Sequence, residues 1–318
     1  MTIQNLKKLF SVSPVINSIN IELPDHDPYV PSVDPNYVFD KDLLNQVLLY
    51  LNDPLNDCLF ISGPSGCGKT SIIMQIAARL KWPVQSITCS AKTESQDLIG
   101  HTTIKDGALT FVYGALVNAM LNGHILLINE IDLMPPSDLT ALNDVLDGKP
   151  LTIVQNNGEV IRPHKNFRVI VTANTKGSGD DLGQYIGTRV LNKAFLDRFR
   201  FVDASYPDKE AEHKILKTAY PLLSDTVASC IIKLAAEIRG LMSDDADATS
   251  IDTPFTTRSL LRIGGIACNY PKISMLKAVD MGYASRLAPV EREFIKRLTL
   301  DIFGNKADKI FYYSVIQD

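Results

Sequence analysis

Residues 63 to 70 read Gly63-Pro64-Ser65-Gly66-Cys67-Gly68-Lys69-Thr70, and this stretch determines how the rest of the sequence is interpreted. The apolar run Cys58–Ser62 precedes it, and a helical pattern over Thr70–Leu80 follows it. A strand, a glycine-rich turn ending in Gly-Lys-Thr and a helix, in this order, are typical of a loop whose backbone N–H groups surround phosphates.

Each residue type in this stretch has a chemical role in holding a nucleoside triphosphate. Glycine lets the backbone approach a phosphate closely, and the first turn of the following helix adds partial positive charge. We expect Lys69 to reach the β- and γ-phosphates of ATP and the Thr70 hydroxyl to ligate Mg²⁺, with Ser71 beside them. The alternative is a glycine-rich turn without a ligand, and the flanking strand and helix argue against it.

A second apolar run, Ile125–Asn129, ends in residues suited to ATP hydrolysis. Glu130 stands where a general base belongs, and its carboxylate would polarise the attacking water. Asn129 occupies the position of a Mg²⁺-holding Asp and brings no charge, so we expect weakened rather than abolished Mg²⁺ binding. The structural alternative is that Glu130 and Asp132 only cap the end of a strand.

A third apolar run, Val169–Ala173, ends in Asn174. We expect this amide to orient the attacking water or to contact the γ-phosphate, between the strand that precedes Gly63 and the strand that precedes Glu130. Taken alone, Asn174 would be interpreted as an ordinary turn asparagine.

Residues 58–205 alternate short apolar runs with helical patterns, which predicts an α/β fold with a parallel sheet covered by helices on both faces. A hairpin with an Asn-Gly turn is expected within residues 151–161. The expected strands are Cys58–Ser62, Val84–Thr88, Ile125–Asn129, Arg168–Thr172 and Phe201–Ala204, and the expected helices are Thr70–Leu80, Gly114–Leu121 and Asp138–Leu146.

Three regions follow from these patterns. Residues 1–39, rich in Pro, Asp and Asn, are expected to form an extended lead-in rather than a packed unit. Residues 40–205 are the nucleotide-binding domain, whose first helix would be capped by Asp40. Residues 206–318 are expected to form a small all-helical domain with an acidic surface loop at 243–250 and these helices: Ala211–Tyr220, Thr226–Arg239, Thr257–Asn269, Met275–Tyr283 and Glu291–Phe303.

Arginines near the expected domain edges are candidates for sensing or stabilising phosphate charge. Arg198 directly precedes the last expected strand, at the far edge of the nucleotide domain, and is a candidate arginine finger for the ATP of a neighbouring subunit. Arg189 and Arg200 are the alternatives, and a surface salt bridge is the structural explanation. Arg258, at the start of a helix in the second domain, would report the nucleotide state, with Arg262 one turn on as the alternative.

Composition limits the class of protein and its partners. The net charge of −4 gives no general attraction to nucleic acid or anionic lipid. None of the five cysteines forms a C-x-x-C pair, so reduced thiols are expected. No apolar run approaches the ~18 residues of a membrane-spanning helix, and no secretory signal is recognisable, so a cytoplasmic location without a membrane partner is expected.

Together these features resemble the AAA+ ATPases of the MoxR group, and most closely the CobS-type ATPase subunits of aerobic cobaltochelatases. The resemblance covers roughly residues 30–205. Besides the motifs above, it rests on Val30–Asp40, Ala78–Pro83, Asp97–Gly100, Ile104–Gly107, Val160–His164, Thr172–Asp180, Tyr185–Thr188 and Asp197–Phe199.

The resemblance implies a homo-oligomeric ring, most often a hexamer, with ATP at subunit boundaries and with a von Willebrand factor A domain protein as partner. The segments near 101–112 and 151–161 would face the ring pore and touch clients. Two departures are that Asn129 replaces the Walker B Asp and that the C-terminal helices match less clearly. The implied roles are Walker A for Lys69 and Thr70, Walker B for Glu130, sensor 1 for Asn174, the finger for Arg198 and sensor 2 for Arg258.

Three hypotheses for function remain open from the sequence. The first is an ATP-driven enzyme that remodels a partner, in one version as the ATPase subunit of a cobalt or magnesium chelatase whose other subunits hold the tetrapyrrole. The second is an ATP-dependent assembly switch with slow or no hydrolysis, because Asn129 lacks a charge. The third is a nucleic-acid motor or loader, against which the net charge and the lack of a recognition motif both argue.

Overall fold

The computed structural model describes residues 2–10, 14–21, 27–179, 185, 187–241, 251–270, 272–304 and 307–308. The chain divides into two compact units. The first comprises Met1–Asp34, Phe39–Pro64 and Gly68–Ser205, and the second comprises Pro35–Val38, Ser65–Cys67 and Tyr206–Asp318. The acidic loop expected at 243–250 lies outside the described residues.

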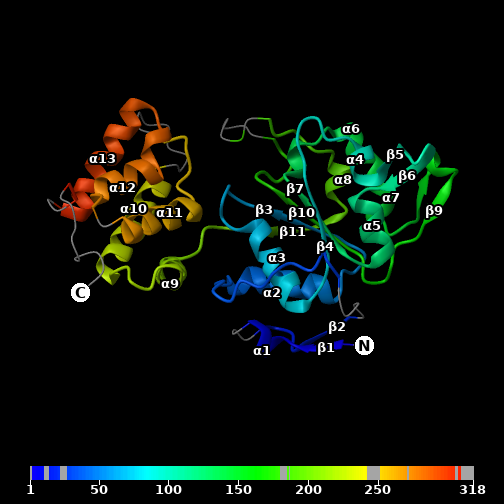
Figure 1. The fold of residues 1–318 in the computed structure, drawn as a ribbon, viewed down its shortest axis with the longest axis horizontal. Coiled ribbons are helices and arrows are strands. Elements are labelled where there is room, and N and C mark those ends of the chain that lie inside the picture. Colours follow the sequence, from blue (N-terminus) through cyan, green and yellow to red (C-terminus); the bar gives the residue numbers. More distant parts are fainter. Residues whose placement is uncertain are drawn as a thin grey trace. The chain divides into compact units, whose positions relative to one another are not determined.

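A five-stranded sheet forms the centre of the first unit (Figure 1). All neighbouring strands run parallel, which confirms the predicted α/β fold class. Because the inner strands of a parallel sheet are covered on both faces, the sequences of the three inner strands are almost continuously apolar, whereas those of the two edge strands are mixed. The strands, in spatial order, are β11 (Phe199–Asp203), β3 (Cys58–Ser62), β10 (Arg168–Ala173), β7 (Ile125–Asn129) and β4 (Val84–Thr88).

Alternate residues of these strands bury against helices on opposite faces. Phe60, Ile128 and Val171 belong to a buried cluster together with apolar residues of the helices within 115–146 and of the helix at 193–196. Helices α2 (Lys41–Asn52) and α3 (Lys69–Leu80) lie on the other side of the sheet (Figure 1). The helices of the first face are α5 (Ala115–Asn122), α6 (Pro136–Leu139), α7 (Asn143–Leu146) and α8 (Lys193–Leu196), and a short α4 (Ser95–Ile99) contacts α5.

Two predicted elements differ from the structure in detail. The helix expected over Asp138–Leu146 is broken into α6, the 3₁₀ turn Thr140–Leu142 and α7. At the break, the Thr140 hydroxyl donates to the Ser137 carbonyl at 2.6 Å, a local bond that competes with regular helix. Strand β11 begins two residues earlier than expected, so Arg200 lies inside the strand.

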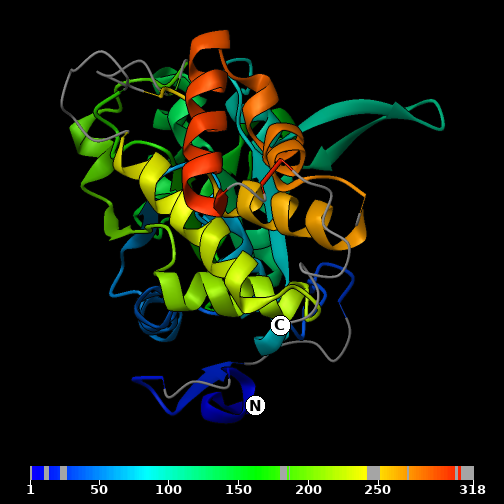
Figure 2. The ribbon, with the colours of Figure 1, turned by 90° about the vertical axis from the view of Figure 1, so that its left-hand side faces the viewer.

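Two antiparallel hairpins are inserted in the first unit. β5 (Gly100–Lys105) and β6 (Ala108–Tyr113) form an arm that projects from the unit, teal in Figure 2. β8 (Leu151–Ile153) and β9 (Glu159–Ile161) form the predicted hairpin, with the 3₁₀ turn Val154–Asn156 and the left-handed residues Asn157 and Gly158 between them. The Tyr113 hydroxyl donates to the Glu159 carboxylate and joins the two hairpins.

The N-terminal segment corrects the expectation of an extended lead-in. β1 (Thr2–Asn5) pairs with β2 (Ser18–Ile21), and α1 (Leu6–Phe10) lies between them. The side chains of Leu6, Phe10, Ile19 and Ile21 are buried. The expectation rested on Pro24, Pro28, Pro31 and Pro35, whereas this apolar set lies before them. Residues 27–40 do lack helix and strand.

The second unit contains the five predicted helices, each within two residues of its expected bounds. They enclose a separate apolar core that includes Leu234, Phe255, Leu260 and Ile263. Side chains of Asp208, Ser224, Thr256 and Ser274 cap four of the helices. The elements are α9 (Lys209–Ala219), α10 (Asp225–Gly240), α11 (Thr257–Asn269), α12 (Met275–Gly282), the 3₁₀ turn Ala284–Arg286 and α13 (Pro289–Phe303). No helix among the described residues is long and apolar enough to cross a membrane.

Candidate functional site

The glycine-rich loop leaves β3 through backbone conformations that favour glycine. Gly63, Gly66 and Gly68 have φ values of +152°, +72° and +105°. A Cβ atom on Gly63 would lie 2.1 Å from the carbonyl oxygen of Ala204, so no other residue fits beside the end of β11. Gly68, at the start of α3, has no side chain with which to cap this helix.

Lys69 lies in the first turn of α3 and is 9% exposed. Its ammonium group donates to the carbonyl oxygens of Gly63 at 2.5 Å and Pro64 at 3.0 Å, and to Oδ1 of Asn174 at 3.0 Å. The cation is therefore held at the mouth of the loop, in contact with the end of a second strand. Ser71 donates back to the Gly68 carbonyl at 2.9 Å.

Asn129, at the end of β7, is buried and hydrogen-bonded on both sides of its amide. Its Oδ1 accepts from the hydroxyls of Thr70 at 2.6 Å and Thr172 at 3.2 Å. Its Nδ2 donates to Ser86 Oγ at 3.1 Å and to the Ile87 carbonyl at 3.3 Å. The Thr70 hydroxyl and the Asn129 carbonyl are neutral oxygen ligands of the kind that Mg²⁺ accepts, so the two predicted metal-binding residues fit this ion.

Glu130 follows Asn129 in a left-handed conformation, with φ of +55°. Such a backbone is uncommon for a residue other than glycine and occurs often at functional sites. The Glu130 side chain is exposed, so its carboxylate is open to water.

Asp132, two residues further on, was considered in the sequence only as a strand cap. It is 0% exposed, and its Oδ2 accepts three hydrogen bonds of 3.1 Å, from the N–H groups of Asn174 and Thr175 and from the Thr175 hydroxyl. Its backbone carbonyl accepts from the N–H of Arg189 at 2.7 Å. The signal in the sequence was an acidic residue between the apolar Ile131 and Leu133.

The strand order explains why these residues meet. β10 lies between β3 and β7, which confirms the predicted position of Asn174 between the strand before Gly63 and the strand before Glu130. The carboxyl ends of parallel strands face the same edge of a sheet, where open α/β folds bind ligands. At this edge Asn174 contacts Lys69, and Asn129 contacts Thr70.

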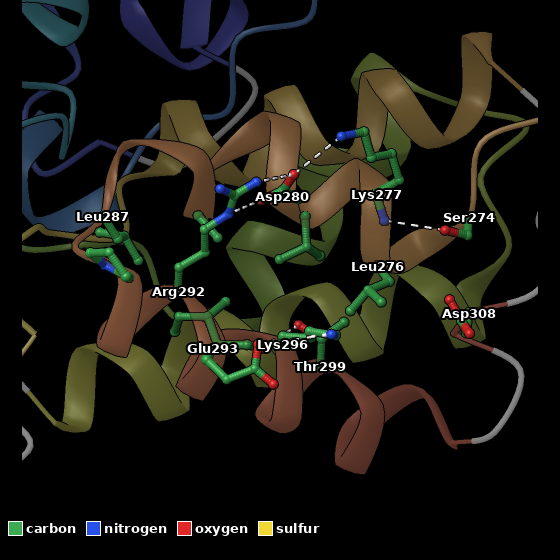
Figure 3. A pocket seen from close by; sticks show the side chains of 14 residues that line it. Ser274, Leu276, Lys277, Asp280, Leu287, Arg292, Glu293, Lys296, Thr299 and Asp308 are labelled. Carbon is green, nitrogen blue, oxygen red and sulfur yellow. Dashed lines mark hydrogen bonds and ion pairs between the residues drawn. The ribbon is translucent and has the colours of Figure 1, made fainter.

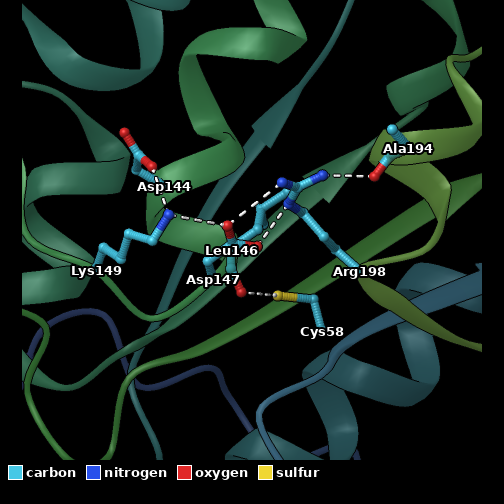
Figure 4. Close-up of polar contacts among 7 residues, drawn as sticks. All are labelled: Cys58, Asp144, Leu146, Asp147, Lys149, Ala194 and Arg198. Carbon is cyan, nitrogen blue, oxygen red and sulfur yellow. Dashed lines mark hydrogen bonds and ion pairs between the residues drawn. The ribbon is translucent and has the colours of Figure 1, made fainter.

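Arg198 precedes the edge strand β11, as predicted, but its guanidinium is engaged within the chain (Figure 4). Nε and Nη2 donate to the two carboxylate oxygens of Asp147 at 2.6 and 3.3 Å, and Nη1 donates to the Ala194 carbonyl at 2.5 Å. The hydrogen bond from Arg198 lowers the pKa of Asp147. Within a single chain, Arg198 therefore forms a salt bridge with Asp147, which is the structural explanation that the sequence left open beside the arginine finger.

The other candidate arginines occupy different surroundings. Arg200 donates to the Pro54 carbonyl and the Asp57 carboxylate. The Arg189 side chain is exposed. In the second unit, Arg258 lies exposed in the first turn of α11, and Arg262 donates to the Gly282 carbonyl at 3.2 Å.

A cavity of about 560 Å³ in the second unit contains none of the predicted site residues. Helices α12 and α13 supply most of its lining (Figure 3). Arg292 and Lys277 both reach toward Asp280, and the hydrogen bond from Arg292 lowers the pKa of this carboxyl group. The cavity wall is thus held together by its own ion pairs.

Comparison with known proteins agrees with this geometry. Residues 58–199 match the family described as "AAA domain (dynein-related subfamily)". An uncharacterised protein of Staphylococcus haemolyticus is 30% identical over 217 residues, which are 65% of this chain and 79% of that protein. An uncharacterised protein of Staphylococcus aureus (strain USA300) is 31% identical over 60% of this chain and 74% of that protein.

A third relative carries a functional name. The aerobic cobaltochelatase subunit CobS of a Sinorhizobium species is 36% identical over 180 residues, 55% of this chain and 54% of that protein. The parallel sheet, the glycine-rich loop and these similarities define a nucleotide-binding AAA+ protein. The chain belongs to the AAA+ ATPase family, in the dynein-related subfamily, and is close to CobS and the MoxR group.

Proposed function

We propose that this chain forms a ring-shaped ATPase that hydrolyses ATP and uses the energy to remodel or activate a partner protein. The observation that carries the proposal is the 3.0 Å contact between Lys69 and Asn174, beside the 2.6 Å contact between Thr70 and Asn129. These contacts join the ends of three strands at one point, where a triphosphate on residues 63–70 would place its γ-phosphate.

In this proposal, each residue has a separate task. Lys69 leaves the carbonyl groups of its own loop and binds the β- and γ-phosphates, while Asn174 holds the γ-phosphate or the attacking water. The exposed carboxylate of Glu130 accepts the proton of that water. Thr70 and Asn129 would hold Mg²⁺. When bound, this ion would neutralise part of the negative charge of the phosphates.

In a ring, Arg198 would act on the ATP bound to the neighbouring subunit. As the finger of a neighbouring subunit, its guanidinium would exchange the Asp147 carboxylate for the γ-phosphate, which is also an anion with paired oxygens. Arg258 is proposed to report the nucleotide state from α11.

The partner is proposed from family resemblance and from the exposed hairpins. Ile104 and Leu109 lie opposite each other in β5 and β6 and are 73% and 78% exposed, so they present apolar side chains to a client. A von Willebrand factor A domain protein is the proposed partner, and a metal chelatase is one complex in which such an ATPase would serve.

The proposal is tested by phosphate release with Mg²⁺ and ATP, together with light scattering with and without nucleotide. Wild type should turn over and assemble with ATP. Glu130→Gln should bind ATP but lose roughly 10²–10⁴-fold in kcat, and Arg198→Ala should lose about 10³-fold or more while still binding ATP. The matched controls are Glu237→Gln and Arg297→Ala, two exposed positions in the second unit. Full activity in Glu130→Gln would contradict the assigned base.

Asn129 favours a second candidate, an ATP-dependent assembly switch with slow hydrolysis. Both ends of its amide are hydrogen-bonded, so the neutral group is accommodated by its surroundings. ATP-dependent assembly of a wild-type protein that does not release phosphate, alone or with its partner, would support the switch instead of the motor.

A further inference from the structure

We infer that Asp132 is a positioning residue that sets Asn174 in place for the γ-phosphate and links it to the loop that carries Glu130. This inference rests on the proposed ATPase function. Asp132 does not touch the nucleotide in this assignment; it acts through the backbone of residues 174 and 175.

The contacts of Asp132 converge from two segments of the chain. The side chain accepts the N–H groups of two consecutive residues, Asn174 and Thr175, and also the Thr175 hydroxyl. The backbone carbonyl accepts the N–H of Arg189, in the segment that leads to α8. A single residue of the turn after β7 therefore holds the turn after β10 and the stretch before Arg198.

Because Asp132 is buried, its hydrogen bonds fix the backbone conformation at residues 174 and 175. A carboxylate that is 0% exposed must be compensated by donors, and its hydrogen bonds are stronger than those between neutral groups. The N–H donors of these adjacent residues fix the two peptide planes on either side of the Asn174 Cα atom, which determines the direction in which the Asn174 side chain leaves the backbone. That side chain accepts from Lys69 at 3.0 Å.

Only one oxygen of Asp132 is used by these donors. Oδ1 is buried without a hydrogen-bond partner among the described residues, whereas Oδ2 accepts all three bonds. In Asp132→Asn the amide oxygen can take the place of Oδ2 and keep the acceptor, whereas Asp132→Ala removes it. The pair of variants therefore separates loss of charge from loss of the contact.

The test is a double-mutant cycle on nucleotide discrimination, which does not require hydrolysis. The Kd values of ADP and of a non-hydrolysable ATP analogue are measured with Mg²⁺ by isothermal titration calorimetry, and phosphate release is measured in parallel. We expect Asn174→Ala and Asp132→Ala each to lower the preference for the ATP analogue over ADP by about tenfold. The double variant should lose no more than Asn174→Ala alone, because both changes remove the same contact.

Asp132→Asn should keep more of this preference than Asp132→Ala. Glu212→Gln is the matched control, because Glu212 is also buried, at 2% exposure, and bonded to Arg239 in the second unit. It should leave nucleotide discrimination unchanged even if it lowers the unfolding temperature.

The outcomes are distinct. Additive losses in the double variant, or normal discrimination in Asp132→Ala, would overturn the inference, as would an Asn174→Ala variant that discriminates like wild type. A wild-type protein that binds neither nucleotide would instead refute the proposed function itself. Equal, non-additive losses with ADP affinity intact would establish the positioning role.

Discussion

At residue 129, an asparagine and an aspartate differ in one side-chain atom: the asparagine has a nitrogen that donates hydrogen bonds, and the aspartate has an oxygen that can only accept them. Nδ2 donates to the Ile87 carbonyl, a group that a carboxylate oxygen would repel. The other amide atom, Oδ1, serves Thr70 and Thr172, and an aspartate would keep these two bonds. The choice between amide and acid at residue 129 therefore affects folding and metal binding in opposite directions.

We predict that Asn129→Asp lowers the free energy of unfolding by about 1–3 kcal/mol without Mg²⁺, because a buried donor bond is lost and a charge is buried. The variant should bind Mg²⁺ more tightly than wild type, since a carboxylate replaces a neutral ligand. Urea denaturation with and without MgCl₂ measures both effects.

Asn122→Asp is the matched control, because its Nδ2 also donates to a carbonyl, that of Asn118, but at an exposed site. It should change the unfolding free energy little. An Asn129→Asp protein as stable as wild type without Mg²⁺ would show that the Ile87 contact has no energetic weight.

At the scale of the elements, Tyr50 of α2 completes the hydrogen bonding of β10. The register of β10 with β3 begins at Ile170 and Leu59, one residue after Val169. The Tyr50 hydroxyl donates to the Val169 carbonyl at 2.7 Å and accepts from the Val169 N–H at 3.1 Å, and all these groups are buried. Burial also raises the pKa of Tyr50 well above its ordinary value.

Tyr50→Phe should therefore lower the free energy of unfolding by about 1–3 kcal/mol, because two buried backbone groups lose their partner. ATP binding should change little, since Asn174 lies at the opposite end of the strand. Chemical denaturation and nucleotide titration check the two statements. Tyr220→Phe serves as control, because no hydrogen bond of its hydroxyl is found in the described part of the chain; equal losses in both variants would contradict the assignment.

Helices and strands could be predicted where the deciding pattern is local in the sequence. The apolar runs predicted the five sheet strands, and the proposed capping residue Asp40 fits the observed start of α2. Contacts between distant segments were not predictable, because they depend on the strand order. Asp132 and Asn174 are separated by 42 positions, Asp147 and Arg198 by 51, and Tyr50 and Val169 by 119. The pairing of β1 with β2 was missed because these short strands carry no strong periodicity.

At the scale of the whole molecule, three carboxyl groups among the described residues have lowered pKa values and predict a common response to acid. Arg198 lowers the pKa of Asp147, Lys176 that of Asp203, and Arg292 that of Asp280, mainly by hydrogen bonding. Since the folded-state values lie below the ordinary value of 3.8, the stabilisation is present above pH 3.8 and is lost as pH falls through the lower folded-state values.

We expect the unfolding temperature, followed by circular dichroism, to fall as pH drops below about 4. Higher salt should weaken the part of the folded-state stabilisation that comes from these exposed ion pairs. In Asp280→Asn the unfolding temperature should depend less on pH in this acidic range, because one of the three carboxyl groups no longer titrates. If the unfolding temperature of Asp280→Asn depended on acidic pH in the same way as that of wild type, Asp280 would not contribute to the acid response.

The position of β3 in the sheet also sets the order in which the chain can fold during synthesis. Its two neighbours are β10 and β11, the last strands of the sheet to be made. Roughly 100 residues separate β3 from β10, which at 5–20 residues per second corresponds to about 5–20 s of translation. During this interval β3 has neither strand neighbour. A ligand of residues 63–70 can therefore bind beside a paired β3 only after the ribosome has completed the chain through β10.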